Sequence, residues 1–156
     1  MQAKEIEKNI YSLFADIASS LGYSEIHGRI IAALLVKGGK LSLQELAKET
    51  GYSPSMVSLS LDFLEVFGII KKVKKAGDRK LYVELQGNLL SALRKAFIMR
   101  LGKNVELTLT KFKELRKELE TAEGEERKEV LRTLTILEKE VKRLQKYLKI
   151  VEKIKI

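Results

Sequence analysis

The sequence predicts a mainly α-helical protein with one small β-hairpin, and three observations support this prediction. Apolar residues recur at helical spacing near both ends of the 156-residue chain. Between residues 42 and 68, two segments carry the start and stop signals of short helices. A basic run at 71–80 lies between two short segments in which apolar and polar residues alternate, as in paired strands.

The N-terminal segment predicts an amphipathic helix over residues from about 4 to 20. Its apolar stripe steps by four, three and four positions through Ile6, Ile10, Leu13 and Ile17. A single helix of this length is marginal in water, so its apolar face needs another surface. We therefore expect residues 1–22 to form an N-terminal dimerisation helix.

A second helical stretch follows, with His27 and Gly28 about one turn from its start. Glycine inside a helix costs about 1 kcal/mol relative to alanine. Gly28 therefore indicates that another helix packs closely at this point. We expect His27 to lie at the surface or at the edge of the core, and we assign it no chemistry.

Residues 42–68 carry the signals of two short helices joined by a tight turn. Ser42 can cap the first helix while Glu45 reaches back to the amide of the cap. Ser53 followed by Pro54 begins the second helix, because proline has no amide to leave unpaired in a first turn. Glycines end both helices. The segment is therefore expected to form a helix-turn-helix.

The second helix of this pair, residues 54–67, has two distinct faces. Val57, Leu61 and Leu64 recur at i, i+4 and i+7, so they are expected to face the core. The opposite face is mostly small and polar near its N-terminus and comprises Ser55, Ser58, Leu59 and Asp62. The helix contains no Arg or Lys.

The run KKVKKAGDRK at residues 71–80 holds six cations and one anion, more than half of the net charge of +9. Alternating apolar residues on both sides predict a hairpin that turns near Ala76-Gly77-Asp78. A cationic hairpin suits a polyanion, whereas a solvated basic loop is the alternative interpretation. Because this hairpin follows a helix-turn-helix, the arrangement is typical of a winged helix, in which the second helix enters the major groove of DNA.

Three short segments between residues 24 and 85 carry a resemblance to a known family: HGRIIAALL, YSPSMVSLSLDFL and GIIKKVKKAGDRKLYVEL. The last contains Gly77-Asp78-Arg79-Lys80 followed closely by Tyr82. These segments resemble the MarR group of winged-helix regulators and, more narrowly, its GbsR-like branch. The resemblance implies a dimeric DNA-binding regulator joined through its terminal helices. Many MarR relatives carry Arg or Lys on the outward face of the recognition helix, which residues 54–67 lack.

The C-terminal region contains two further apolar stripes, separated by a break at residues 121–126. The first runs from Val105 to Leu119. The second has heptad spacing and comprises Val130, Leu134, Leu137, Val141, Leu144, Leu148 and Val151. This pattern predicts a coiled coil, either between two copies of the chain or as an antiparallel hairpin with the first stripe. The family resemblance favours pairing between copies.

These elements predict three regions: an N-terminal dimerisation helix (1–22), a winged helix-turn-helix DNA-binding domain (23–86) and a C-terminal helical dimerisation region (87–156). The predicted function is a homodimeric transcriptional regulator that binds a pseudo-palindromic operator in double-stranded DNA. Recognition helix 54–67 would enter the major groove, and basic wing 70–85 would contact the backbone or the minor groove. The alternative is a protein–protein assembly module that uses an outward surface of Leu59, Phe63 and Val66.

The candidate DNA-binding residues are Ser53, Ser55, Ser58, Leu59, Lys72, Lys74, Lys75, Arg79 and Lys80. The wing cations would contact phosphates, and Arg79 suits insertion into a narrow minor groove. The two serines of the first turns would read base edges, and Leu59 can contact a thymine methyl. Amides after Ser53 can bind a phosphate, although a serine here can also act as a cap alone. Asp78 is expected to fix the wing turn through an ion pair with Arg79.

Composition argues against several other functions. The chain has no Cys and one His, so it offers no thiolate or multi-histidine metal site, and no catalytic set can be assembled. We predict no enzyme activity, no metal and no cofactor. Without an apolar span or a signal-like start, a cytoplasmic location is expected. The resemblance allows an unidentified small-molecule effector in a pocket near Tyr11, Tyr23 or Phe97.

Overall fold

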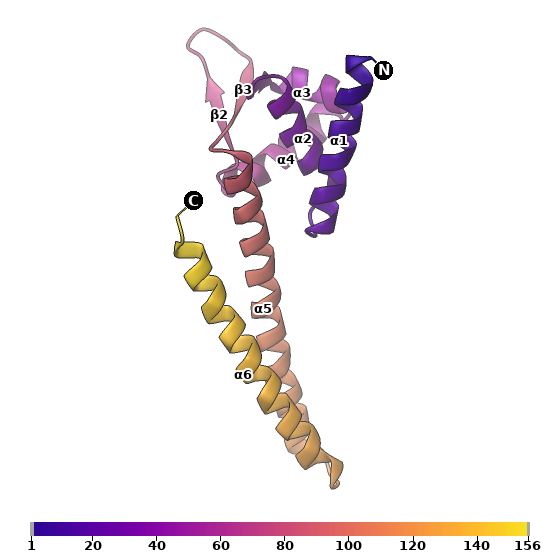
Figure 1. Cartoon of the computed structure of the whole chain (residues 1–156), viewed down its shortest axis with the longest axis vertical. Helices are drawn as coiled ribbons and strands as arrows, with labels where there is room; N and C mark the ends of the chain where they lie inside the picture. Colours follow the sequence, from indigo (N-terminus) through magenta and orange to yellow (C-terminus); the bar gives the residue numbers. More distant parts are fainter. Residues whose placement is uncertain (1, 156) are drawn as a thin grey trace. The chain divides into compact units, whose positions relative to one another are not determined.

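The computed structural model describes residues 2–155, which form six helices and three short strands (Figure 1). The elements are α1 (Ala3–Ser20), α2 (Glu25–Val36), β1 (Lys40–Ser42), α3 (Leu43–Thr50), α4 (Pro54–Val66), β2 (Ile70–Lys74), β3 (Leu81–Leu85), α5 (Leu89–Thr121) and α6 (Glu126–Lys153). The chain divides into two compact units, Met1–Ala96 and Phe97–Ile156, so the division falls within α5.

The helix-turn-helix forms where its capping signals predict it. The Ser42 hydroxyl accepts a hydrogen bond from the Glu45 amide, and the Glu45 carboxylate accepts one from the Ser42 amide, which completes the capping box. These hydrogen bonds lower the pKa of Glu45. Ser53 caps α4 by accepting from the Met56 amide. Gly51, at φ +76°, ends α3 in the left-handed region that glycine adopts without strain.

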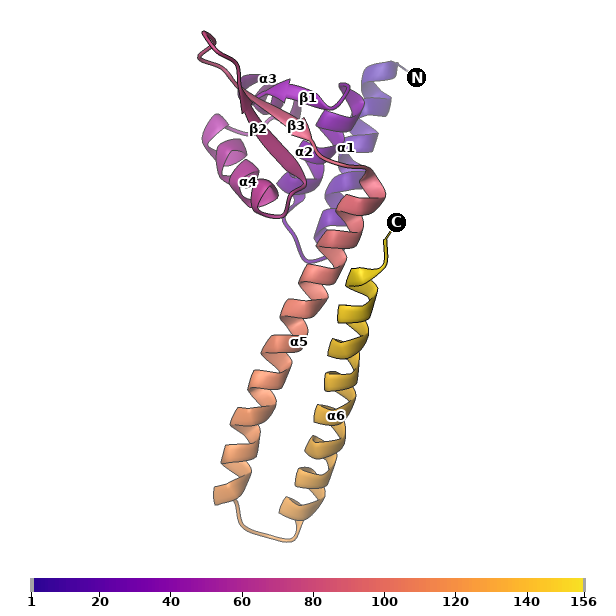
Figure 2. The same cartoon turned by 90° about the vertical axis from the view of Figure 1, so that its left-hand side faces the viewer.

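The three strands form one antiparallel sheet in the order β1-β3-β2 (Figure 2). The predicted hairpin is confirmed: Lys74 pairs with Leu81 at its outer end and Ile70 with Leu85 at its base. Strand β1 was not predicted. It pairs Leu41 with Val83, and so attaches the segment before α3 to the base of the hairpin.

One core joins these elements in the first unit. The predicted inward face of α4 is confirmed, since Val57, Leu61 and Leu64 are fully or almost fully buried. They belong to the same cluster as residues of α2 and the sheet, including Ile30 and Val83. Helix α4 is therefore held in place by its buried side, and its opposite side is exposed.

Helices α1 and α2 cross at Gly28, as the sequence indicated. A Cβ atom at this position would lie 2.1 Å from the carbonyl oxygen of Phe14, a distance that no side chain can adopt. The buried residues of α1 are Tyr11, Ala15 and Ala18, so the predicted stripe is not the buried face, and its Ile10 and Ile17 are half-buried. Ile6 and Leu13 remain exposed.

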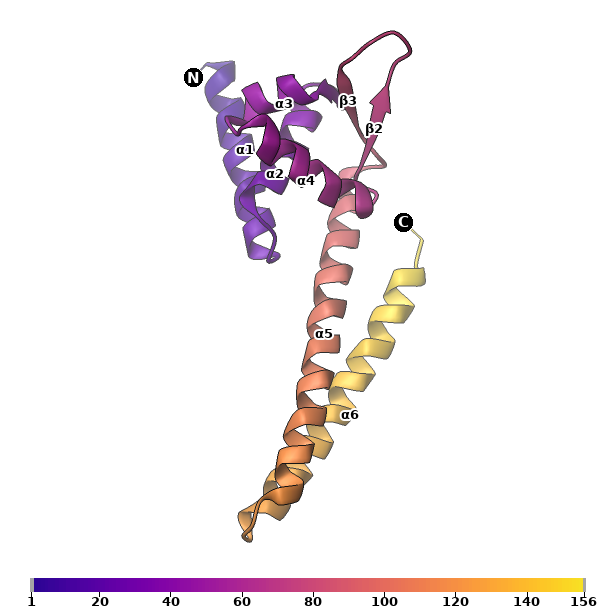
Figure 3. The ribbon, with the colours of Figure 1, turned by 180° about the vertical axis from the view of Figure 1, so that it is seen from behind.

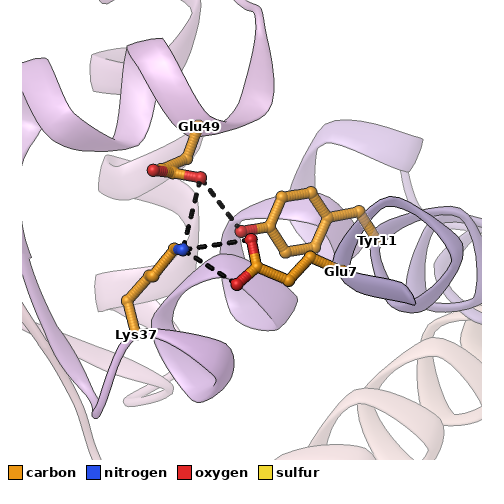
Figure 4. Close-up of polar contacts among 4 residues, drawn as sticks. All are labelled: Glu7, Tyr11, Lys37 and Glu49. Atoms are coloured by element: carbon orange, nitrogen blue, oxygen red, sulfur yellow. Dashed lines mark hydrogen bonds and ion pairs between the residues drawn. The ribbon is translucent and has the colours of Figure 1, made fainter. Parts of the chain in front are cut away.

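A polar cluster links α1 to α3 on the same unit (Figure 4). The Lys37 ammonium donates to both carboxylate oxygens of Glu7 at 3.0 Å and lies 4.0 Å from Glu49. The Tyr11 hydroxyl donates to Glu49 at 3.3 Å, and burial together with this carboxylate raises the pKa of Tyr11 to about 12. The cluster thus anchors the N-terminal helix to the helix-turn-helix.

In the second unit, the remainder of α5 and α6 form an antiparallel helical hairpin (Figure 3). The guanidinium of Arg116 donates to both carboxylate oxygens of Glu138, at 3.2 and 2.9 Å, and to the Thr135 hydroxyl. Leu134 and Leu148 of the heptad pattern are buried. The other heptad positions are more open, and Val130, Leu137 and Leu144 are exposed. Pairing within one chain therefore uses part of the predicted seam.

Candidate nucleic-acid interface

The outward face of α4 presents small hydroxyls and apolar side chains. Ser53 and Ser55 are exposed and Ser58 is half-buried. Two apolar side chains are also open to solvent here: Leu59 is 74% exposed and Met56 is 51% exposed. The predicted contact residues Ser55, Ser58 and Leu59 therefore lie on the open N-terminal half of α4. Ser53 lies directly before this helix, and its hydroxyl accepts the capping hydrogen bond from the Met56 amide.

The tip of the hairpin projects beyond the helices of its unit (Figure 1). The turn closes with a hydrogen bond of 3.1 Å from the Asp78 amide to the Lys75 carbonyl. Gly77 sits inside this turn at φ +80°, a conformation that favours glycine. The turn thus lies where the sequence placed it.

Asp78 holds the hairpin tip in one conformation. Its carboxylate accepts from the Lys80 amide at 2.9 Å and from the Tyr82 hydroxyl at 3.2 Å. These bonds, the first of them above all, lower the pKa of Asp78. The structural role predicted for Asp78 is present, but through hydrogen bonds from Lys80 and Tyr82 instead of the expected ion pair with Arg79.

Tyr82 connects the tip to the sheet through its ring as well as its hydroxyl. The ammonium groups of Lys75 and Lys40 lie 5.1 and 5.6 Å from the centroid of the ring. At these distances a cation is attracted to the aromatic face. The aromatic residue of the wing motif therefore organises the cations around it.

Four predicted contact residues gather at the tip of the wing: Lys74, Lys75, Arg79 and Lys80. All four are exposed, and within residues 2–155 none of them forms a salt bridge with a carboxylate. Cations that are not held by a carboxylate are available to an external anion. The tip is therefore the part of this surface best suited to bind phosphates.

Lys72, the fifth predicted cation, has different surroundings. Its ammonium pairs with Asp62 and lies 4.0 Å from Glu65, while its amide donates to the Glu65 carboxylate at 3.1 Å. Both carboxylates belong to the C-terminal half of α4. Lys72 thus joins β2 to α4.

An apolar cavity with an aromatic wall lies in the first unit, between α1, α2, the end of α4 and the first turns of α5. Its lining includes Phe14, Ile31, Phe67, Leu89 and Leu93. Of the three aromatics predicted for a pocket, Tyr23 lines this cavity. Tyr11 belongs to the polar cluster, and Phe97 is exposed and outside the lining.

His27 lines the cavity, which the sequence did not predict. The imidazole stacks on Phe63 with ring centroids 4.4 Å apart, and Phe63 also contacts Tyr23 and Phe67. The expectation that Phe63 faces outward is wrong, because this half-buried ring belongs to the aromatic group around the cavity. The Nδ1 atom of His27 is buried and has no hydrogen-bond partner among the described residues. The sequence signal that could have indicated this aromatic group is His27 in HGRII together with Phe63 and Phe67 in LDFLEVF.

Because His27 is partly buried, the free energy of unfolding of the protein should depend on pH. Burial lowers the pKa of the imidazole, so below its unfolded pKa of about 6.5 the unfolded chain binds a proton that the folded chain excludes. The contribution is complete above that value and is lost as the pH falls toward the lowered pKa. We expect the free energy of unfolding in urea to drop between about pH 7 and pH 5.

The His27→Phe variant provides the control for this prediction, because the chain has one histidine. It keeps an aromatic ring against Phe63 and removes the titrating group. Its free energy of unfolding should fall less over the same pH range. An equal fall in both proteins would contradict the assignment of the pH dependence to His27.

Two negative findings concern the described residues. No helix within residues 2–155 is both long and apolar enough to cross a membrane. Over the same range, no three His, Asp or Glu side chains are grouped so that they can hold a metal ion.

Comparisons with known proteins support the fold. No protein-family model and no curated protein matches the chain. A crystal structure described as a transcriptional regulator matches with a TM-score of 0.63 and 21% identity, covering 92% of each chain. A MepR-like protein complexed with pseudoligands matches at a TM-score of 0.44 and 21% identity, covering 86% of this chain and 87% of that one. An S. aureus MepR mutant bound to an oligodeoxyribonucleotide matches at 0.44 and 19%, covering 90% and 94%.

The first of these likenesses extends over nearly the whole of both chains. At 21% identity, the first shows the fold and does not by itself show the function. Together with the capped helix pair and the three-stranded sheet, it establishes that this chain has a winged-helix fold.

Proposed function

We propose that the protein is a DNA-binding transcriptional regulator of the MarR type that acts as a homodimer. The observation that carries this proposal is the group of four exposed cations at the wing tip, none in a salt bridge with a carboxylate of residues 2–155, on the same unit as the open face of α4. In winged helices such a hairpin contacts the DNA backbone or minor groove while the second helix enters the major groove. The overall likeness to a transcriptional regulator supports the same conclusion.

The electrostatic features of the wing favour a nucleic acid over a small anion. Lys74, Lys75, Arg79 and Lys80 are spread over both sides of the turn, so they suit a repeated anion such as a phosphate backbone. The Asp78 carboxylate keeps the turn in place by accepting two hydrogen bonds from residues of the hairpin itself. A fixed hairpin loses little conformational entropy on binding.

Dimer formation through the terminal helices is the second part of the proposal. The heptad residues Val130, Leu137 and Leu144 stay exposed after the α5–α6 hairpin has formed, as do Ile6 and Leu13 on α1. Apolar residues repeated every seven positions on one helix are typical of a further helix-helix contact. A two-fold dimer would present two recognition helices, which accounts for a pseudo-palindromic operator.

Finer assignments belong to this proposal as well. The GbsR-like branch rests on the wing pattern from Gly77 to Tyr82. The division into 1–22, 23–86 and 87–156 assigns DNA binding to the middle region and dimerisation to the flanking ones. A cytoplasmic location and the absence of enzyme activity follow from the proposed role of a regulator.

Selection from a random duplex library, followed by footprinting, tests the proposal directly. The expected result is a shared pseudo-palindrome with two protected half-sites. Sedimentation equilibrium of the free protein should give twice the chain mass. A protein that prefers no duplex but forms a defined complex with another protein would instead support the assembly alternative, for which Leu59 and Val66 remain exposed.

We also propose that the apolar cavity is the site of a small-molecule effector. The specific observation is the buried Nδ1 of His27, which lacks a hydrogen-bond partner among the described residues. In the tautomer that carries its proton on Nε2, Nδ1 is a buried acceptor without a partner, which is costly, and a ligand that donates a hydrogen bond would remove that cost. Since burial lowers the pKa of His27, the imidazole is neutral near pH 7. The suited ligand is a compact, mostly apolar molecule with one donor group.

Paired ligands can test this assignment. Phenol and anisole have similar rings, but only phenol can donate a hydrogen bond. Thermal-shift titrations should show tighter binding of phenol to the wild-type protein, and His27→Phe should remove the difference. If the two ligands bind the wild-type protein equally, or if neither binds, Nδ1 does not select a donor.

A further inference from the structure

The exposed face of α4 lacks the side chains that usually identify bases by paired hydrogen bonds. Residues 54–67 contain no Arg, Lys, Asn or Gln. Arg and Lys make bidentate contacts to guanine, and Asn and Gln make them to adenine. The remaining means of direct reading in the major groove are hydroxyl contacts, carboxylate contacts to cytosine and apolar contacts to the thymine methyl group.

The surroundings of Asp62 and Glu65 make it unfavourable for these carboxylates to accept hydrogen bonds from cytosine bases. Both are engaged by Lys72, through its ammonium and, for Glu65, through its amide as well. An anionic pair on a helix in a groove would also be repelled by the flanking phosphates. The interaction with Lys72 offsets this charge and keeps both side chains directed to β2. Reading therefore falls to the first two turns of α4.

Two apolar side chains are open on those turns. Met56 and Leu59 are three residues apart, on the same side of the helix, and are 51% and 74% exposed. The charge of the surrounding surface favours a DNA partner over a protein partner, because the wing tip of the same unit carries four exposed cations that form no salt bridge with a carboxylate of residues 2–155. Lysine is depleted in protein–protein interfaces, and three of these four cations are lysines.

We propose that Met56 and Leu59 contact thymine methyl groups, so that the operator half-sites carry thymines beneath the first two turns of α4. This inference deepens, and rests on, the proposed function as a DNA-binding regulator. Ser55 and Ser58 can hydrogen-bond to either neighbour in a base pair and add little selectivity. Methyl contact thus determines base preference, and the wing supplies most of the affinity.

Replacing single thymines with uracil in a selected duplex provides the experiment, because uracil lacks the 5-methyl group and keeps the same hydrogen bonds. For each thymine in contact, the wild-type protein should lose affinity by about fourfold, which corresponds to the ~0.8 kcal/mol of one buried CH₂ group. The Leu59→Ala variant should lose that sensitivity at one position of each half-site. Because Leu59 is largely exposed, this variant should fold normally, which circular dichroism can verify.

Val66→Ala is the matched control. Val66 is as exposed as Leu59 and apolar, but it is the last residue of α4, so the variant should keep the full response to uracil. Unchanged affinity for every uracil duplex, with the selected sequence still preferred over a scrambled one, would overturn methyl reading and leave the regulator proposal intact. No preference for the selected duplex would overturn both. Equal effects of the two alanine variants would also overturn the role of Leu59.

Discussion

Replacing Lys74, Lys75, Arg79 and Lys80 with glutamine is expected to lower duplex affinity by roughly a thousandfold at about 0.15 M salt. A dimer would lose eight wing cations, which is about four phosphate contacts if half of them touch the backbone. Each such contact contributes about 0.9 to the slope of log K against log salt. The slope should therefore become less negative by about 4. Fluorescence anisotropy at a series of salt concentrations measures both quantities.

The control for this variant changes charge by the same amount elsewhere. Lys128, Lys139, Lys146 and Lys149 are exposed residues of α6, and replacing them with glutamine also removes four cations. This protein should keep most of its affinity and its slope. If both variants lose affinity equally, net charge and not the wing governs binding. If neither does, the wing does not contact DNA.

Gly28→Ala is expected to destabilise the first unit even though alanine is the better helix former. Helix propensity alone would favour alanine by about 1 kcal/mol. The added Cβ, however, would meet the Phe14 carbonyl oxygen at 2.1 Å and the Ala15 amide nitrogen at 2.9 Å. Both are backbone atoms, so α1 must move away from α2, which loosens the contacts of Tyr11 and Ala18.

Forced overpacking of this kind costs about 1–3 kcal/mol. For a unit of this size, each kcal/mol lowers Tm by about 4–8 °C. Gly102→Ala is the matched control, since Gly102 lies inside α5 and an added Cβ there meets nothing within 4 Å. That variant should be as stable as the wild-type protein or more stable by up to about 1 kcal/mol. A Gly28→Ala protein with a raised Tm would contradict the close packing of α2 against α1 at this position.

Features that depend on local sequence were predictable. The capping box at Ser42, the cap at Ser53 and the turn at Gly77 each involve residues within four positions of one another. The inward face of α4 followed from helical period alone. Such signals need no knowledge of distant parts of the chain.

Features that depend on distant residues were not predictable. Strand β1 is three residues long, and each of its residues pairs with one at least forty positions later in the sequence. The cavity draws its lining from four helices, so no single segment indicated it. Phe63 was placed outward because helical period cannot distinguish solvent from an aromatic neighbour such as His27.

The C-terminal region lies between these two cases. Heptad spacing correctly predicted a packed helix, but the choice of partner could not be made from α6 alone. Arg116 and Glu138 show that the pairing occurs within one chain. The exposed positions, such as Leu137, are those on which the proposed dimer depends.

The contacts of Lys72 affect how scanning mutagenesis of the wing should be interpreted. An alanine at this position would leave Asp62 and Glu65 without their cation, and the exposed carboxylates would repel phosphates. Affinity would fall whether or not the Lys72 ammonium ever approaches DNA, so a simple scan would record a false contact. Restoring the affinity by also replacing Asp62 and Glu65 with neutral residues would identify the loss as indirect.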